Sequence, residues 1–345
     1  MSATVYRFIS RCLAGWLLCA FPLWATPEPG HVYRLLLLDS QVGSPYGEIR
    51  EALLKGLSSL GYESGRNLEV KQYTAGNDEE RGAALLAAET AWHPDVVYVG
   101  GTLATLSAKR VLFGSDQPVV FAAPTDPVGM GVIDDFATPP KANFTGVCYP
   151  VPIKARFRFI HQLLPQARRF GLIYADMPQS HSYNAWIRQL LAEDPTFKGM
   201  EVIFRPVPMV TGEAGDQQMA ALAIPIIKAL DGEVDAFISP HDQMGSRMAF
   251  AELIARYASK PLIGIVRNDV MEGWGATATV YPSHESIGLQ AAGMIRDIFE
   301  GKPVAQVEPQ WPARYGYALD LPKIRHFGIK VPVGMLQLAG RNIVK

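Results

Sequence analysis

Apolar runs that alternate with segments of helical periodicity constrain this chain more than any other feature. A run at 33–40 (YRLLLLDS) precedes a segment with leucines at helical spacing, and similar runs follow at 68–73, 95–100 and 118–124. Short apolar runs bounded by polar turns are typical of buried strands, and strands that alternate with helices form parallel sheets. The first part of the chain is therefore predicted to be a parallel sheet with helices on both faces.

The pattern changes at 144–152 (FTGVCYPVP), where a strand runs into a proline-flanked segment, and then starts again. Further strands are predicted at 170–175, 201–207, 234–238 and 261–266, and an extended segment at 275–281 precedes a helix over 285–299. We predict an α/β fold of two Rossmann-like lobes with parallel sheets, joined by a multi-strand hinge. Lobe 1 comprises residues 31–148 and 280–302, and lobe 2 comprises residues 149–279 and 303–345.

The first 25 residues have the features of a secretory signal peptide. Arg7 and Arg11 precede an apolar run (CLAGWLLCAFPLW) that ends before Ala25. Cys19 follows two leucines where a lipobox carries small residues, so a lipoprotein is not expected. Cleavage after Ala25 leaves Cys148 as the one cysteine and excludes an intramolecular disulfide. We expect a periplasmic protein.

Charge and motif content exclude several function classes. The 32 basic and 33 acidic residues give a net charge of −1, and no basic block points to nucleic acid. The chain contains no G-x-S-x-G, Walker A or H-E-x-x-H motif. Ser239, His241 and Asp242 are too close in sequence to assemble a nucleophile, base and orienting acid by local contact. We therefore expect no catalytic residues, no metal and no cofactor.

Polar side chains that follow the predicted strands are the candidate ligand-binding residues. The carboxyl ends of parallel strands meet at one edge of a sheet, where α/β proteins bind small molecules. In lobe 1 the candidates are Ser40, Gln41, Ser44, Tyr46, Gly101, Thr102, Leu103, Thr125 and Asp126. In lobe 2 they are Asp176, Gln179, Ser180, Tyr183, His241, Asp242, Gln243, Arg267 and Asn268.

Each candidate role has a structural alternative. Thr102 follows two glycines at the predicted N-cap of a helix over 103–113, where free N–H groups suit a carboxylate, but the same residues also suit a tight turn. Asp126 could pair with an ammonium group or form the Asp-Pro turn. Arg267 could clamp a carboxylate or bridge the lobes. Tyr46 and Tyr183 could cover a ring or alkyl chain, or belong to the core.

Short motifs spread over the chain carry a resemblance to a known family. They lie at 61–67 (GYESGRN), 93–97 (HPDVV), 101–102 (GT), 118–121 (PVVF), 126–128 (DPV), 143–147 (NFTGV), 291–292 (AA), 301–303 (GKP), and 328–332 (GIKVP). With these motifs in this order, the chain resembles the ABC-transporter substrate-binding proteins of the type I periplasmic class, in particular the TrpX-like proteins.

The resemblance implies a monomeric receptor that closes on a small polar ligand and delivers it to an ABC permease with its ATPase. Aromatic and other amino acids lead the implied ligands, although the sequence departs from the family at 124–125 and 318–322, which leaves the cargo open. A periplasmic sensory module that signals to a membrane receptor is the alternative. A hydrolase or isomerase on a Rossmann-like scaffold is a third interpretation.

Overall fold

A computed structural model describes residue 28 and residues 30–345. The predicted signal peptide therefore lies outside the described residues. Among the described residues, none of the helices combines the length and hydropathy needed to cross a membrane.

Lobe 1 is built on a five-stranded, fully parallel sheet with the strand order β2-β1-β3-β4-β5. Its central strands are buried along nearly their whole length, as their continuous apolar runs require. The strands are β1 (Tyr33–Asp39), β2 (Leu68–Thr74), β3 (Val96–Gly100), β4 (Val119–Ala122) and β5 (Phe144–Val147). The helices are α1 (Tyr46–Ser59), α2 (Glu79–Glu89), the short η1 (Thr90–Trp92), α3 (Thr102–Leu112) and α9 (His284–Phe299).

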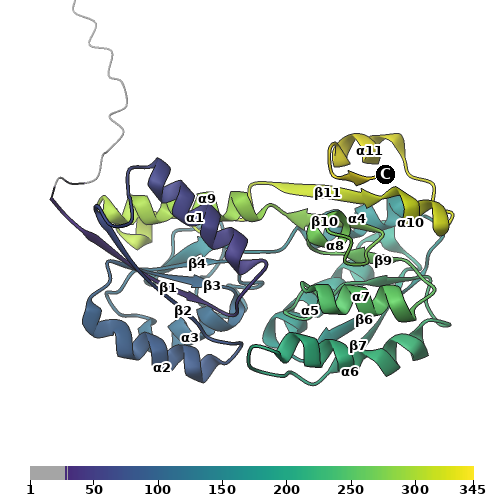
Figure 1. The fold of residues 1–345 in the computed structure, drawn as a ribbon, viewed down its shortest axis with the longest axis horizontal. Coiled ribbons are helices and arrows are strands. Elements are labelled where there is room, and N and C mark those ends of the chain that lie inside the picture. Colours follow the sequence, from purple (N-terminus) through teal and green to yellow (C-terminus); the bar gives the residue numbers. More distant parts are fainter. Residues whose placement is uncertain (1–27, 29) are drawn as a thin grey trace, which may run out of the picture.

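Helices cover both faces of the lobe 1 sheet. The apolar sides of α1 and α9 pack on one face, and those of α2 and α3 pack on the other. Figure 1 shows this three-layer arrangement, with α1 and α9 above the sheet and α2 and α3 below it. The carboxyl edge of the sheet, where β3 ends and α3 begins, faces lobe 2.

Lobe 2 is built on a seven-stranded sheet with the order β12-β11-β10-β9-β8-β6-β7. The strands are β6 (Arg169–Ala175), β7 (Glu201–Val207), β8 (Ala236–Ile238), β9 (Leu262–Gly264), β10 (Ala278–Pro282), β11 (Tyr315–Asp320) and β12 (Ile343–Val344). The helices are α4 (Ile153–Leu163), α5 (Pro178–Glu193), η2 (Pro195–Phe197), α6 (Gly215–Leu230), α7 (Met248–Tyr257), α8 (Asn268–Met271), α10 (Leu321–His326) and α11 (Val333–Ala339). One core lies under α6 and α7, and a second lies under α4 and α5.

The predicted fold class of two α/β lobes with mainly parallel sheets is confirmed. The expectation of parallel strands is wrong at one place, since β11 pairs antiparallel with β10. The chain reaches β11 directly from lobe 1, without the crossover helix that a parallel neighbour on the same sheet would need. Strand β10, whose last residues we assigned to lobe 1, pairs with β9 and β11 of the lobe 2 sheet, and the chain enters lobe 1 at α9.

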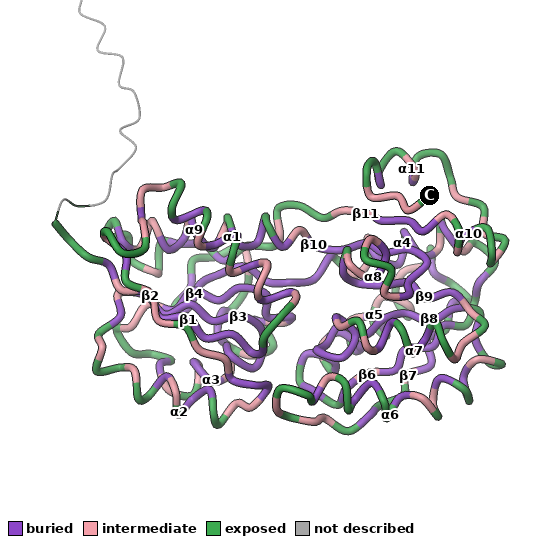
Figure 2. Tube along the Cα trace, viewed as in Figure 1, coloured by how far each residue is buried: buried purple, intermediate pink, exposed green. Residues whose placement is uncertain are grey.

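Three chain segments connect the lobes, and they hydrogen-bond to one another. They run from β5 to α4, from β10 to α9, and from η3 (Val304–Gln306) to β11. The N–H of Cys148 donates to the carbonyl of Gln310 (3.1 Å), and the N–H of Ser283 donates to the carbonyl of Arg314 (2.9 Å). Figure 2 shows buried backbone at the centre of both lobes and exposed backbone on the outer helices.

Candidate functional site

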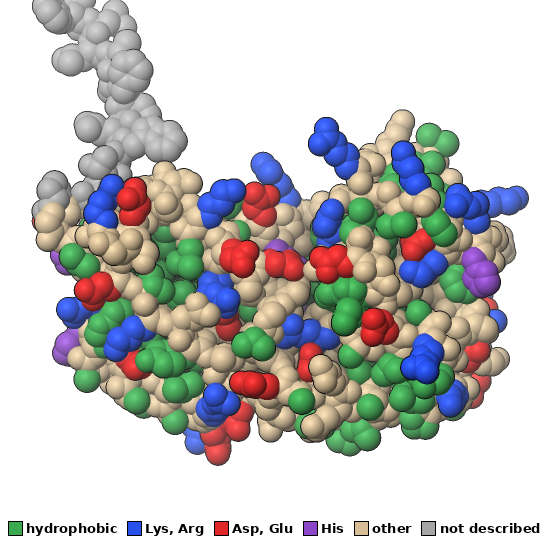
Figure 3. Space-filling model, in the orientation of Figure 1, with side chains coloured by type: hydrophobic (Ala, Val, Ile, Leu, Met, Phe, Trp, Pro, Cys, Tyr) green, Lys and Arg blue, Asp and Glu red, His purple; other side chains and the backbone are tan. Residues whose placement is uncertain are grey.

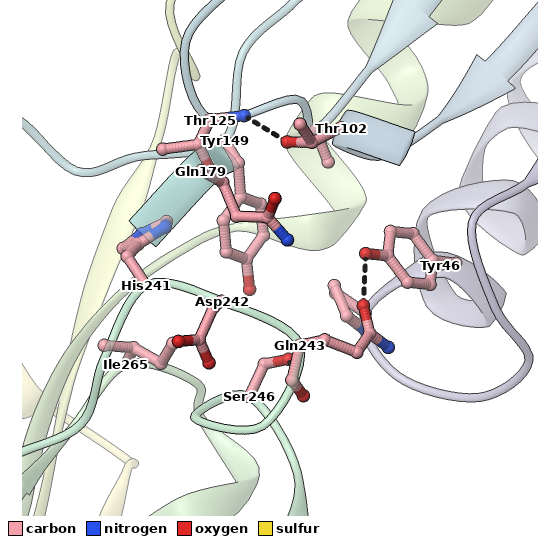
Figure 4. A pocket seen from close by; sticks show the side chains of 12 residues that line it. Tyr46, Thr102, Thr125, Tyr149, Gln179, His241, Asp242, Gln243, Ser246 and Ile265 are labelled. Carbon is pink, nitrogen blue, oxygen red and sulfur yellow. Dashed lines mark hydrogen bonds between the residues drawn. The ribbon is translucent and has the colours of Figure 1, made fainter. Parts of the chain in front are cut away.

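A small cavity lies between the lobes, at the carboxyl edges of both sheets. Its walls are formed by Pro45, Tyr46, Thr102, Ala123, Thr125 and Tyr149 on one side, and by Gln179, His241, Asp242, Gln243, Ser246 and Ile265 on the other. Figure 4 shows how these side chains converge. The space that the centre of a water molecule can occupy there is about 20 Å³, and one buried water needs roughly 10–15 Å³. The lobes are therefore closed, and must separate for a solute to enter.

The N-terminus of α3 forms the lobe 1 wall of the cavity. Gly101, with φ +91°, is the N-cap, so the helix begins at Thr102, one residue earlier than predicted. The hydroxyl of Ser40 accepts a hydrogen bond from the N–H of Ala104 (3.0 Å). The hydroxyl of Thr102 accepts one from the N–H of Thr125 (3.2 Å), which leaves its own proton free to be donated.

Gly101 is required by the approach of Tyr46 rather than by open space for a ligand. A Cβ atom at Gly101 would lie 2.5 Å from Cε1 of Tyr46 and 2.7 Å from Oγ of Ser40. Gly101 therefore allows the Tyr46 ring to lie against the start of α3. Leu103, the next residue of the helix, packs into the core cluster of lobe 2 and forms an apolar contact between the lobes.

Amide side chains connect the two walls directly. The Gln243 amide hydrogen-bonds the Tyr46 hydroxyl (2.9 Å) and lies 2.7 Å from Oε1 of Gln41. Gln41 also accepts from Nδ2 of Asn77 (2.6 Å) within lobe 1 and donates to the carbonyl of Glu213 (3.1 Å) in lobe 2. Gln41 is thus held between the lobes, beside the cavity.

The lobe 2 wall depends on the long loop that follows β8. Asp242 fixes this loop, since its carboxylate accepts from the N–H of Ala175 (2.8 Å), the hydroxyl of Ser180 (2.9 Å) and the N–H of Gly245 (2.9 Å). Burial raises the pKa of Asp242 to about 6, although these hydrogen bonds act in the opposite direction. Ser180 therefore supports Asp242 from the first turn of α5.

A stack of three side chains lies behind the lobe 2 wall. The His241 ring lies on the Tyr183 ring with centroids 4.4 Å apart, and the Tyr183 hydroxyl accepts from the buried guanidinium of Arg156 (3.1 Å). Burial, together with the positive charge of Arg156, lowers the pKa of His241 well below its ordinary value. His241 is consequently a neutral imidazole. The stacked Tyr183 ring supports it on the side away from the cavity.

Tyr149 enters the cavity from the hinge. Its N–H donates to the carbonyl of Pro124 (3.0 Å), and its hydroxyl lies 3.0 Å from Nε2 of His284. The other ring nitrogen of His284 hydrogen-bonds the carboxylate of Glu48. Tyr149 is 5% exposed and its ring also contacts His241 edge-on at a centroid distance of 5.1 Å.

The structure brings seven of the predicted residues together as walls of the cavity. These seven are Tyr46, Thr102, Thr125, Gln179, His241, Asp242 and Gln243. A second group lies directly behind the walls or between the lobes and holds those residues in place: Ser40, Gln41, Gly101, Leu103, Ser180 and Tyr183. Ser44 belongs to the turn next to the lining residue Pro45.

Four predicted residues lie away from the cavity. Oδ1 of Asp126 accepts from the N–H of Gly129 (2.8 Å), which is the turn-forming role. Asp176 is exposed and pairs with His181 (2.7 Å). Arg267 and Asn268 line a separate groove on the outer surface, between α1 and α8. Acidic side chains gather near this part of the face in Figure 3.

Sequence reasoning missed five lining residues, namely Pro45, Ala123, Tyr149, Ser246 and Ile265. Ala123 and Ile265 follow strands but are apolar, so a search for polar strand ends passes over them. Tyr149 does have a signal, since it is an aromatic residue in the segment where the strand pattern breaks before lobe 2.

The donor set of the cavity suits binding of a small polar molecule. Hydroxyl and amide groups dominate, with one carboxylate and one neutral imidazole. Within the described residues, no group of three His, Cys, Asp or Glu side chains is arranged to hold a metal ion.

Comparisons with known proteins agree with this arrangement. A conserved domain protein from Vibrio cholerae O1 biovar El Tor has a similar structure, with 21% identity and a TM-score of 0.78 over 91% of this chain and 100% of that chain. A domain from Streptococcus pneumoniae in complex with L-Trp has 20% identity and a TM-score of 0.77, with the same coverage. A solute binding protein from Bacillus halodurans with bound myo-inositol has 12% identity and a TM-score of 0.57, over 86% of this chain and 96% of that chain.

These structural likenesses confirm the periplasmic-binding-protein fold. No curated protein sequence matches the chain. The family model described as ABC transporter substrate binding protein matches residues 43–343, which span both lobes and the hinge. The chain belongs to the family of ABC transporter substrate binding proteins.

Proposed function

We propose that this chain is the periplasmic solute-binding component of an ABC importer, and that it closes its lobes on an amino acid, with aromatic amino acids as the leading ligands. The observation that carries the proposal is that both lobes supply walls to one cavity. A ligand shifts a conformational equilibrium only by its differential affinity for the two states. A solute that contacts both walls favours the closed form, which is the form that a permease would recognise.

The lobe 1 wall supports recognition of a carboxylate. The first-turn N–H groups of Thr102 and Leu103 have no acceptor within α3, whereas that of Ala104 already donates to Ser40, and the positive end of the helix dipole lies there. Thr102 adds a hydroxyl proton, because its oxygen already accepts from Thr125. A carboxylate at this position would receive donors from both the backbone and a side chain.

The remaining surface supports an apolar or aromatic ligand side chain. Tyr46, Tyr149 and Ile265 provide apolar area between the polar groups. The S. pneumoniae structure with a similar fold holds L-Trp, which has a carboxylate and an aromatic ring. A ligand of that size exceeds the present space of about 20 Å³, so the lobes would close less far around it. Binding without conversion is the function proposed, together with export by the signal peptide predicted in the first 25 residues and delivery to a permease and ATPase.

A thermal-unfolding screen tests this proposal. The mature chain should be stabilised by L-tryptophan or a related amino acid, by about 2.7 kcal/mol at a ligand concentration of 100 Kd, and not by myo-inositol. Mass spectrometry should recover the ligand unchanged. Stabilisation by polyols alone would contradict the proposed ligand class, and chemical conversion of the ligand would contradict a purely binding role.

Substitution of Thr102→Val tests the carboxylate site. We expect roughly 10-fold to 100-fold weaker amino-acid binding by calorimetry, since a hydrogen bond to a charged group is lost. Thr105→Val is the matched control, because Thr105 is buried one turn further along α3, donates to the carbonyl of Gly101 (2.7 Å) and does not line the cavity. Equal affinities of the two variants would contradict the assignment.

A further inference from the structure

Tyr149, His284 and Glu48 form a continuous chain of hydrogen bonds from the cavity to the outer surface. Tyr149 lines the cavity, and its hydroxyl lies 3.0 Å from Nε2 of His284. Nδ1 of His284 bonds to Oε2 of Glu48, and Oε1 of Glu48 accepts from Nδ2 of Asn268 (3.2 Å). Glu48 and His284 belong to the packed helices α1 and α9 of lobe 1, and Tyr149 belongs to the core cluster between them and the sheet, so these three are held together within lobe 1. Asn268 adds a contact from lobe 2.

The carboxylate fixes which nitrogen of His284 carries the proton. Burial raises the pKa of Glu48, but its interactions with His284, together with hydrogen bonds from Ser44 and Asn268, outweigh burial, and the pKa lies below its ordinary value. An ionised carboxylate only accepts hydrogen bonds, so when the His284 ring is uncharged its single proton lies on Nδ1 and is donated to Glu48. Nε2 is then an acceptor, and the Tyr149 hydroxyl must donate to Nε2.

The direction of this hydrogen bond determines what Tyr149 offers to a ligand. With its proton held by His284, the oxygen of Tyr149 presents only lone pairs. The ring has little freedom, since it stacks on His284 at a centroid distance of 5.8 Å and contacts His241 at 5.1 Å. Tyr149 is therefore a fixed acceptor in the cavity wall.

Asp242 is the one carboxylate that lines the cavity, and protein donors already hold it in place. Both oxygens of Asp242 already accept from protein donors. Oε1 of Gln179 is buried and has no hydrogen-bond partner among the described residues. Figure 4 shows Gln179 and Tyr149 in the middle of the site. Tyr149 and Gln179 are thus two lining side chains with acceptor capacity to spare for a ligand with several donors.

We propose that Tyr149 binds the ammonium group of the ligand, and that His284 and Glu48 are positioning residues that keep the tyrosine oxygen an acceptor. The inference rests on the proposed function, because it specifies which group of an amino acid each wall recognises. The carboxylate lies at α3 and the ammonium group lies toward the hinge.

Paired ligands and variants test the proposal. L-tryptophan and indole-3-propionate share a ring and a carboxylate, but the second lacks the ammonium group. In Tyr149→Phe, calorimetry should find L-tryptophan bound about tenfold or more weakly, and indole-3-propionate bound within about twofold of its wild-type affinity. Equal losses for the two ligands, or no loss for either, would overturn the proposal.

Variants of His284 separate positioning from packing. His284→Leu should lower the preference for L-tryptophan over indole-3-propionate, and His284→Gln should partly restore it, because an amide oxygen can still accept the tyrosine proton. His181→Gln is the control, since His181 forms an exposed pair with Asp176 away from the cavity. Failure of the glutamine variant to differ from the leucine variant would count against the positioning role.

A ligand-free measurement distinguishes this inference from the proposed function. In nitrogen-15 spectra of the wild-type chain, His284 should carry its proton on Nδ1, with Nε2 showing the shift of an unprotonated nitrogen. A proton on Nε2 would overturn the arrangement even if amino acids bind. Failure of the wild-type protein to bind either indole ligand would instead overturn the ligand class, and with it this use of Tyr149.

Discussion

Asp269 is a buried carboxyl group that shapes the lobe 2 wall without touching the cavity. Its Oδ2 accepts from the N–H groups of Ile265 (2.8 Å) and Val266 (3.0 Å), and a Cβ at Gly264 would collide with that oxygen. Its Oδ1 has no hydrogen-bond partner among the described residues. Burial raises the pKa of Asp269 to about 7. The turn that places Ile265 at the cavity is therefore coupled to the protonation of Asp269.

This coupling predicts a pH dependence of stability. Because the folded pKa of Asp269 is raised, the folded state holds a proton that the unfolded chain releases above its ordinary pKa of 3.8. The contribution of Asp269 is complete below that value and is lost as pH rises toward about 7. Asp269→Asn should remove up to about 1.4 kcal/mol per pH unit from the slope of the free energy of unfolding.

Urea unfolding at several pH values between these limits measures the slope. Asp39 and Asp242 also have raised pKa values and also contribute to the slope. The slope of each variant is therefore compared with the slope of the wild type. Asp116→Asn, at an exposed position, is the control and should leave the wild-type slope unchanged. Parallel curves for Asp269→Asn and wild type would show that the Asp269 proton is not linked to folding.

At the scale of elements, α9 is fixed to lobe 1 by close contact with α1. A Cβ at Gly288 of α9 would collide with the carbonyl oxygen of Ile49 and would lie 2.6 Å from Cβ of Ala52. The facing Gly56 of α1 is equally restricted, since its Cβ would lie 2.7 Å from that of Ala292. The two helix backbones approach closely because a glycine of each helix faces an alanine of the other.

Alanine at Gly288 should therefore destabilise the protein although alanine favours helices. We expect a loss of about 1–3 kcal/mol in the free energy of unfolding, because the added methyl group meets backbone atoms that cannot move independently. Gly293 is the matched control in the same helix, since a Cβ there would have no atom within 4 Å. Gly293→Ala should stabilise by about 0.5–1 kcal/mol. A gain in stability for both variants would contradict the close packing.

The elements also explain which parts of the site the sequence could predict. Periodicity located the strands, and the strand ends placed Thr102, Thr125 and His241 at the cavity. The direction in which each side chain points was not predictable. Asp126 directly follows Thr125, yet its carboxylate points away from the cavity and accepts from the N–H of Gly129. Pairs such as Glu48 and His284 come from elements 236 residues apart, and no local pattern encodes their contact.

At the scale of the molecule, hydrogen bonds between the lobes hold the closed form. The guanidinium of Arg247 donates to the carbonyl of Val42 (2.6 Å), and the N–H of Gly212 donates to the carbonyl of Gly76 (2.7 Å). Gln41 adds its bonds to Gln243 and to the lobe 2 backbone. Because these contacts need no solute, they contribute to the equilibrium between open and closed forms before a ligand binds.

Gln41→Ala should shift that equilibrium toward the open form. Loss of about two net hydrogen bonds at 0.5–1.5 kcal/mol each lowers the ratio of closed to open molecules roughly 5-fold to 150-fold. Apparent affinity falls with the closed fraction, because the ligand must then supply the cost of closure. Small-angle scattering should give a larger radius of gyration for the ligand-free variant, and saturating ligand should restore the compact form. Gln189→Ala, which removes an exposed contact with Glu193, should scatter like wild type. Identical curves for Gln41→Ala and wild type would mean that the other contacts between the lobes suffice for closure.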